Sequence, residues 1–364
     1  HHGHHGHHGQ GPAVHQQQQQ PHSHHHQQQR EAELLAATAQ LTLEDIRGNV
    51  HRMSKDQVGC RLLQQKLEDG WETVNAIYQE AKPHLVDMML DPFGNYLFQK
   101  ILETVSEEER GEVVDQVAGK VVAAGLNLHG TRSVQKLVEL TKGTPAQLCQ
   151  VVAALDKATV ELCNDPNGNH IIQRVLQHLP AKDNNFVFKA LTESCVAVST
   201  QRHGCCVVQR ALDAADKEQR RTLVAKVADN ALQLMQDPYG NYVVQYVLQI
   251  SSAEDVVLIV KAPLGQVSML SMQKFSSNVV EKCLEKADED TATRYLEELA
   301  APSTMKAMLQ DQYANYVFQR AFSMGPHDAA LKLVAAVQEH LPSLRNSSGG
   351  RRITNKILKR FPDA

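Results

Sequence analysis

The stretch Asp237-Pro238-Tyr239-Gly240-Asn241-Tyr242-Val243-Val244-Gln245 decides the fold, because versions of it recur along the whole chain. Each version has a small residue, then a small or polar one, a flat or long one, two mostly apolar ones, and Gln or Glu. The small or polar position falls at Cys60, Asn95, Thr131, Asn169, Cys205, Asn241, Ser277 and Asn315. The steps are 35, 36, 38, 36, 36, 36 and 38 residues, and 36 more reach Arg351 in a degenerate copy. This period predicts a solenoid, in which each unit buries its apolar face against its neighbours.

The composition suits stacked helices and limits the function classes. Hydrophobic residues make up 42% of the 364 residues but aromatic ones only 5%, which favours aliphatic helix packing. The net charge of −4 disfavours a wholly basic nucleic-acid binder, so any such site must be a local stripe. We find no apolar run long enough for a bilayer and no secretory segment. Seven cysteines without a CxxC pair favour a reducing compartment.

The two ends of the chain differ from the repeats. Residues 1–30 are nearly all His, Gln and Gly, and we expect them to be disordered. Their His pairs could bind a transition metal, although a low-complexity tail with incidental metal affinity is the simpler interpretation. We expect residues 31–55 and 340–364 to form caps, with a helix start at Thr42. The first residue is His rather than Met, which suggests a fragment or a processed chain.

Each unit reads as two main helices, and no sustained strand alternation appears, so we predict an all-α fold. Between the sixth and seventh phrases, Ser252 opens a helix that runs to about Val260. Pro263 and Gly265 break it, and another turn and helix follow. The phrase itself lies at the start of a helix.

On a helix, the polar residues of a phrase share one face. With Asn241 at 0°, Gln245 lies at about 40° and Tyr242 at about 100°, while Val243 and Val244 face the core. Taken singly, an Asn after Gly is often a cap and a Gln is usually solvated. Eight paired occurrences favour recognition of a base, because amides match a base edge and a flat ring stacks on its face.

These phrases resemble the repeats of the Pumilio (PUF) family over residues 41–364. The resemblance implies a right-handed α-solenoid crescent of eight repeats with degenerate caps, which binds single-stranded RNA on its concave face. It implies edge-reading pairs at Cys60/Gln64, Asn95/Gln99, Thr131/Gln135, Asn169/Gln173, Cys205/Gln209, Asn241/Gln245, Ser277/Glu281 and Asn315/Gln319. It implies stacking residues at Arg61, Tyr96, Arg132, His170, Cys206, Tyr242, Asn278 and Tyr316.

The resemblance further implies that RNA runs antiparallel to the repeats, which gives the element 5′-UGUAU(A/N)UA. Ser277 with Glu281 places a carboxylate against the N1–H and N2–H₂ groups of guanine. Two residues depart from the family pattern. The methyl group of Thr131 crowds an adenine, so the sixth base is loosely specified, and Cys206 replaces a flat or long stacking residue.

A basic residue follows the reading Gln or Glu in six units: Lys100, Lys136, Arg174, Arg210, Lys282 and Arg320. These residues lie on the same helical side as the stacking residues, where phosphates could pass. Solvated helix charges are an equally good interpretation. We expect the acidic residues to lie on the convex side.

The resemblance implies post-transcriptional control: binding to mRNA 3′ untranslated regions, followed by translational repression or decay. It implies protein co-regulators on the convex face, such as those that recruit a deadenylase, and a cytoplasmic monomer without a cofactor. The rivals are a protein-binding armadillo or HEAT solenoid and a nucleolar, structure-tolerant Pumilio relative. An enzyme is disfavoured, because we find no nucleotide-binding loop, HExxH motif, metal site or paired carboxylates, and no catalytic residue.

Overall fold

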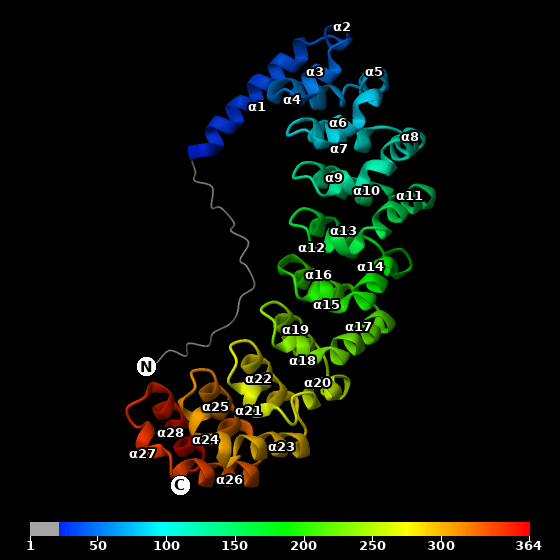
Figure 1. Cartoon of the computed structure of the whole chain (residues 1–364). Coiled ribbons are helices and arrows are strands. Elements are labelled where there is room, and N and C mark those ends of the chain that lie inside the picture. Colours follow the sequence, from blue (N-terminus) through cyan, green and yellow to red (C-terminus); the bar gives the residue numbers. More distant parts are fainter. Residues whose placement is uncertain (1–21) are drawn as a thin grey trace.

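The computed structural model describes residues 22–364, and within that range it is all helical, with no strand. The helices form a crescent of stacked units (Figure 1). Each of the eight units contributes three helices, one to each of three rows, and the degenerate copy at the C-terminal end adds two. The inner row holds α4 (Gln57–Lys66), α7 (Gly94–Thr104), α10 (Gly130–Thr141), α13 (Gly168–His178), α16 (Arg202–Ala214), α19 (Gly240–Ile250), α22 (Ser276–Lys286), α25 (Ala314–Met324) and α28 (Ser348–Arg360).

The outer row follows the convex side of the crescent (Figure 1). It holds α5 (Trp71–Ala81), α8 (Glu107–Val117), α11 (Pro145–Asp156), α14 (Ala181–Glu193), α17 (Lys217–Asp229), α20 (Val257–Lys261), α23 (Glu289–Leu299) and α26 (His327–Gln338). Capping boxes start α8 and α17, where Ser106 and Asp216 each accept a hydrogen bond from the third backbone N–H of the helix. Short 3₁₀ turns continue the row at η1 (Lys82–His84), η2 (Ala118–Lys120) and η3 (Glu254–Val256).

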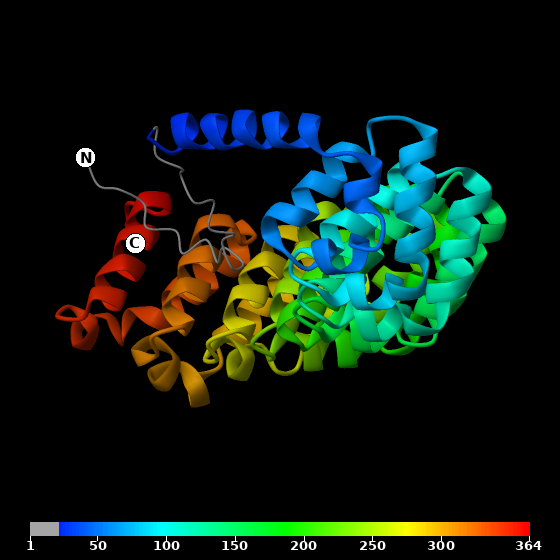
Figure 2. The same cartoon turned by 90° about the horizontal axis from the view of Figure 1, so that it is seen from above.

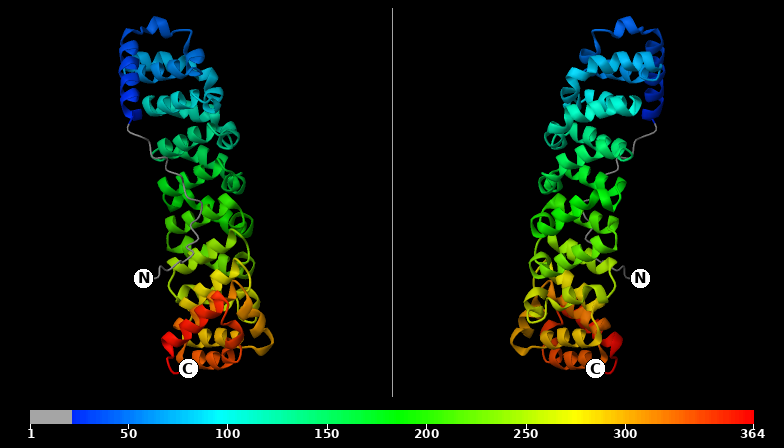
Figure 3. Two further views of the ribbon diagram at one scale, coloured as in Figure 1. Left: turned by 90° about the vertical axis from the view of Figure 1, so that its left-hand side faces the viewer. Right: turned by 90° about the vertical axis from the view of Figure 1, so that its right-hand side faces the viewer.

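In the sequence, a short helix comes directly before each helix of the inner row. Each unit therefore has this short helix in addition to the two main helices that we predicted. These short helices are α3 (Val50–Ser54), α6 (Leu85–Leu90), α9 (Val121–Gly125), α12 (Thr159–Asn164), α15 (Cys195–Ser199), α18 (Ala231–Met235), α21 (Val267–Ser271), α24 (Pro302–Gln310) and α27 (Leu341–Leu344). Seen from the side, the units form a single narrow stack (Figure 3). Helices in neighbouring positions of the inner row contact one another throughout.

One continuous core runs through the stack, as a solenoid requires. It is mostly aliphatic, with a few fully buried aromatic residues such as Phe98, Phe318 and Tyr295. In the inner helix α19, Val243, Val244, Val247 and Leu248 are buried, as the helical periodicity predicts.

The N-terminal end differs from the prediction. We expected residues 1–30 to be disordered, but α1 (His22–Gln40) already includes residues 22–30; residues 1–21 lie outside the described part. Gln, Glu, Arg and Ala have high helix propensity, and α1 contacts α4, with Thr38 buried near its end. The helix leaves the stack and runs along one side of its opening (Figure 2). The predicted helix start at Thr42 is confirmed, because its hydroxyl accepts from Asp45 N at the head of α2 (Leu43–Ile46).

Candidate nucleic-acid interface

Polar side chains, most of them acidic, fix the start of most inner helices. Asp91 Oδ2 accepts hydrogen bonds from Phe93 N at 2.9 Å and Gly94 N at 2.8 Å. These bonds satisfy backbone donors that have no partner inside the helix. Equivalent bonds are made by Asn127, Asp165, Asp237 and Asp311. The Asp-Pro turns predicted from the sequence thus place their phrases at the head of a helix.

The first residue of each reading pair is more buried than the helical wheel suggests. We expected Asn241 to project with Gln245, but Asn241 is only 1% exposed, and all eight first positions are at most 5% exposed. Its Nδ2 donates to Asp237 O at 2.8 Å and to Pro238 O at 2.9 Å. The amide holds the preceding turn because that turn has backbone acceptors without helical partners. Asn95 and Asn169 make the same two bonds.

The second residue of the pair is half-buried and bonded to the first. Gln245 Nε2 donates to Asn241 Oδ1 at 2.8 Å. The same donation occurs from Gln99, Gln173 and Gln319 to their Asn partners, from Gln135 to Thr131 Oγ1 and from Gln64 to Cys60 Sγ. In the fifth unit Gln209 donates to the backbone oxygen of Cys205 instead. The structure therefore brings these seven predicted pairs together.

The seventh unit is chemically different. Ser277 Oγ donates to Lys274 O at 3.4 Å, and the Glu281 side chain is only 20% exposed. Burial raises the pKa of Glu281, and the nearby Arg320 opposes that shift. Arg320 Nε lies 3.7 Å from Glu281 Oε1. A carboxylate with this restricted surface can accept two parallel N–H groups.

Most of the predicted stacking residues lie exposed beside the reading pairs. Tyr96 is 43% and Tyr316 41% exposed, and Arg61, Arg132, His170 and Asn278 are exposed as well. Tyr242 and Cys206 are half-buried. Partial desolvation of its ring lowers the pKa of His170, and the charges of His203 and Arg174 lower it further.

Adjacent stacking positions contact one another. The Arg132 guanidinium lies 5.8 Å from the Tyr96 ring and donates to its hydroxyl. Arg352 lies in the same way, 5.8 Å from the Tyr316 ring. Sequence reasoning missed Arg352, although the 36-residue step to the degenerate copy at Arg351 could have found it. These pairs show that flat groups of neighbouring units face a shared space.

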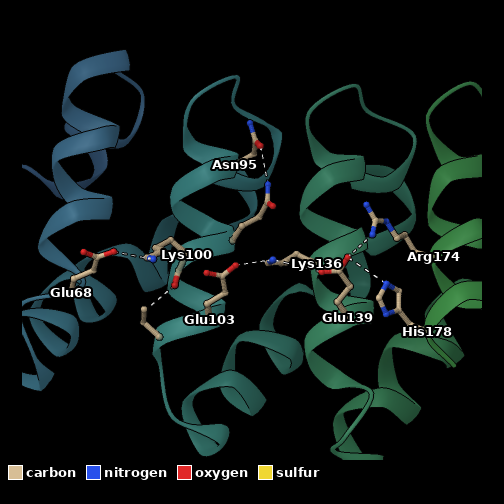
Figure 4. A network of polar contacts seen from close by, with 10 residues as sticks. Glu68, Asn95, Lys100, Glu103, Lys136, Glu139, Arg174 and His178 are labelled. Atoms are coloured by element: carbon tan, nitrogen blue, oxygen red, sulfur yellow. Dashed lines mark hydrogen bonds and ion pairs between the residues drawn. The ribbon is translucent and has the colours of Figure 1, made fainter. Parts of the chain in front are cut away.

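The basic residues after the reading Gln or Glu mostly form ion pairs along the inner row (Figure 4). Lys136 Nζ lies 2.7 Å from Glu103 Oε1, and Arg174 Nη1 lies 2.8 Å from Glu139 Oε1. Lys100 pairs with Glu68 at 3.5 Å. We expected the acidic residues on the convex side. That expectation is wrong for these glutamates, because the inner-row cations of the next unit hold them.

In residues 22–364, no group of three or more His, Cys, Asp or Glu side chains could hold a metal ion. All seven cysteines are free thiols. No helix in this part of the chain is both long and apolar enough to cross a membrane.

A row of polar pairs beside flat side chains, repeated along a helical solenoid, defines a helical repeat protein. Seven segments match the Pumilio-family RNA binding repeat: residues 49–70, 84–118, 159–192, 194–228, 230–262, 266–300 and 307–337. The chain belongs to this family. The matched segments leave out the unit around Thr131, yet its helices α9, α10 and α11 contact one another as α12, α13 and α14 do in the next unit.

Several known proteins are similar over most of this chain. The Pumilio domain-containing protein C6G9.14 of Schizosaccharomyces pombe is 39% identical over 92% of the chain and 49% of its own length. Putative pumilio homolog 8, chloroplastic, of Arabidopsis thaliana is 40% identical over 87% of the chain and 62% of its own length. The chain thus spans about half to three fifths of these relatives.

Solved structures show the same fold. The Puf4 RNA-binding domain bound to an HO endonuclease RNA 3′ UTR recognition sequence matches with a TM-score of 0.75 and 38% identity. The match covers 85% of this chain and 99% of that one. Yeast Puf5p bound to SMX2 RNA matches with a TM-score of 0.79 and 26% identity, over 90% of this chain and 100% of that one.

Proposed function

We propose that this chain binds single-stranded RNA with one base per unit and prefers the element 5′-UGUAU(A/N)UA. The observation that carries the proposal is the series of eight reading pairs, in which Ser277 and Glu281 alone combine a small hydroxyl with a carboxylate. Gln amides offer both donors and acceptors, which suits uracil beside Asn and adenine beside a smaller residue. The carboxylate of Glu281 accepts only, which suits guanine.

The pattern also indicates which bases are read loosely. Thr131 adds a methyl group at the pair that faces the sixth base, and its hydroxyl is already bonded to Asn167 O at 2.8 Å. Cys206 offers little surface for stacking at the fifth unit, whose pair faces the fourth base. We therefore place the strongest selection at the first three bases, where Tyr316, Asn278 and Tyr242 stand at the stacking positions.

We further propose that the chain acts on mRNA 3′ untranslated regions as a post-transcriptional regulator, through translational repression or decay. The solved relatives bound to 3′ UTR recognition sequences support this proposal. In it, the chain is a cytoplasmic monomer without catalytic activity, and protein co-regulators, including one that recruits a deadenylase, dock on the convex face.

The test is a fluorescence-anisotropy titration at fixed salt with UGUAUAUA and with UUUAUAUA. Wild type should prefer the first RNA by about fivefold or more, because a bidentate pair is typically worth about 1–3 kcal/mol. Ser277→Asn with Glu281→Gln should reverse the preference. Equal, weak binding of both RNAs by the wild type would instead support a protein-binding solenoid.

A further inference from the structure

Two arginines contact the reading residue of the unit that precedes their own. Arg174 Nε donates to Gln135 Oε1 at 3.2 Å while its Nη1 lies 2.8 Å from Glu139 Oε1. Arg320 repeats this geometry, with Nε 3.7 Å from Glu281 Oε1 and Nη1 2.8 Å from Glu285 Oε1. In both cases one guanidinium holds the reading side chain and the acid one turn beyond it.

The repeat register explains why the geometry recurs. The residue directly after the reading Gln or Glu of one unit meets the residue four positions after the reading Gln or Glu of the preceding unit. The pairs that follow this rule are Lys100/Glu68, Lys136/Glu103, Arg174/Glu139, Tyr246/Asp213 and Arg320/Glu285. We call this series the inter-unit ladder.

Two basic residues lie outside the ladder. The acceptor positions that would face Arg210 and Lys282 are occupied by Gln177 and Gln249. Arg210 lies 3.4 Å from Asp213 of its own helix, and Lys282 makes no ion pair within residues 22–364. Of the six basic residues, these two are the ones that have no acidic partner in the preceding unit.

The shape of a basic side chain in the inter-unit ladder determines which acceptors it contacts. A guanidinium has a rigid fork of donors and can address two acceptors at once, whereas a lysine ammonium acts as a point charge. Lys136 accordingly reaches Glu103 and Glu139 but makes no bond to Gln99. Among the ladder members, Arg174 and Arg320 contact both the acid and the reading residue, whereas Lys136 contacts acids alone.

We propose that Arg320 is a positioning residue that orients Glu281 for guanine, rather than a phosphate contact. The inference rests on the proposed function. Arg320 is anchored by Glu285, and its Nε side favours one placement of the half-buried Glu281 carboxylate. This contact fixes the orientation in which the carboxylate meets the N–H groups of guanine. Arg174 on Gln135 is a second instance of the same arrangement.

The experiment compares Arg320→Lys and Arg320→Gln with wild type on UGUAUAUA and UUUAUAUA. Both variants should lower the preference for guanine by roughly fivefold to tenfold, because charge-assisted fork contacts are lost. Arg210→Lys and Arg210→Gln are matched controls on a cation outside the ladder. They should change the affinity for both RNAs by one common factor, so the preference stays.

A pH series gives a readout that a loss of packing does not produce. The charged groups that act on Glu281 are Arg320, Glu285 and Lys282. Loss of Arg320 removes a charge that lowers the pKa of Glu281, so Glu281 takes up a proton at a higher pH in Arg320→Gln than in wild type. The preference for guanine should therefore be lost at a higher pH in this variant than in wild type. Glu285→Gln keeps Arg320 but removes the acid that holds it, so this variant should lower the preference for guanine in part. It replaces the arginine variants if those fold poorly.

Each outcome supports or overturns the inference. If wild type prefers guanine and the Arg320 variants bind both RNAs more weakly by the same factor, Arg320 contacts a phosphate and the inference is overturned. Unchanged binding of both RNAs by these variants overturns it as well. Absence of a guanine preference in wild type refutes the proposed function itself.

Discussion

The reading residues are already hydrogen-bonded before any RNA is present. Gln245 donates one N–H to Asn241 Oδ1 and keeps its second N–H and its carbonyl oxygen for a base edge. Asn241 in turn is held by two backbone oxygens of the preceding turn. The pair is thus pre-organised, so if it binds RNA as proposed, little conformational freedom of the protein is lost on binding, which favours affinity.

At Glu281, the requirements of folding and of the proposed recognition differ, because burial disfavours the charged carboxylate that a guanine contact needs. Burial raises its pKa above the ordinary value of 4.5, so the folded chain binds more protons than the unfolded chain between those two pKa values. Stability contributed by this group therefore falls as pH rises through that window. At a pH above both pKa values, the full penalty of burying the charged carboxylate is present.

Glu281→Gln should consequently raise the thermal midpoint at pH 7, by about 1–2 °C for a chain of this size. At about pH 3, well below the ordinary pKa of 4.5, the midpoints of variant and wild type should converge, because the carboxyl is then neutral in both the folded and the unfolded state. Thermal unfolding followed by circular dichroism at both pH values measures this. A variant that is less stable at pH 7 would mean that the attraction to Arg320 outweighs the cost of burial.

At the scale of the element, the inner helix starts very close to the short helix before it. A Cβ atom added at Gly130 would lie 2.3 Å from Ala124 O, whereas one added at Gly94 would lie no closer than 3.1 Å to any atom of α6 or its turn. The seventh and eighth units carry Ser276 and Ala314 there, both fully buried. The approach of the two helices thus differs from unit to unit.

Gly130→Ala should destabilise the protein by about 1–3 kcal/mol, because the clash is with rigid backbone. Gly94→Ala is the matched control and should cost clearly less, since a shift of a few tenths of an ångström suffices and alanine favours a helix. Urea unfolding of both variants gives the comparison. Equal losses would show that the spacing at α9 and α10 relaxes freely.

The helices also show which parts of the fold could be predicted from the sequence. The inner helices, their buried face and the polar pairs followed from the period and the helical spacing, because those signals repeat eight times. The short helices did not, apart from the turn and helix expected after Gly265, since most of them have only four to six residues, too few for an amphipathic period. The buried state of Asn241 also escaped prediction, because a helical wheel ignores the turn that precedes the helix. The composition of residues 22–30 masked their helix propensity.

Across the stack of repeat units, four of the six inner-row cations are balanced by acids of the preceding unit. The net charge of −4 does not show this, because it does not say which side chains meet across units. The inter-unit ladder neutralises Lys100, Lys136, Arg174 and Arg320 on the inner row. RNA binding through bases and stacking then depends less on salt than six free cations would imply.

Glu103→Gln with Glu139→Gln removes the acids that hold Lys136 and Arg174, which should free two cations for phosphates. Each phosphate contact on a single strand contributes about −0.7 to the slope of log K against log salt concentration, so the slope should steepen by roughly 1.4. Anisotropy titrations of UGUAUAUA at several salt concentrations measure this slope. Glu72→Gln with Glu108→Gln makes the same change of charge on the outer helices α5 and α8 and should leave the slope close to that of wild type. If both double variants steepen it equally, the RNA responds to total charge alone, and the ladder has no part in setting how strongly the molecule holds the RNA backbone.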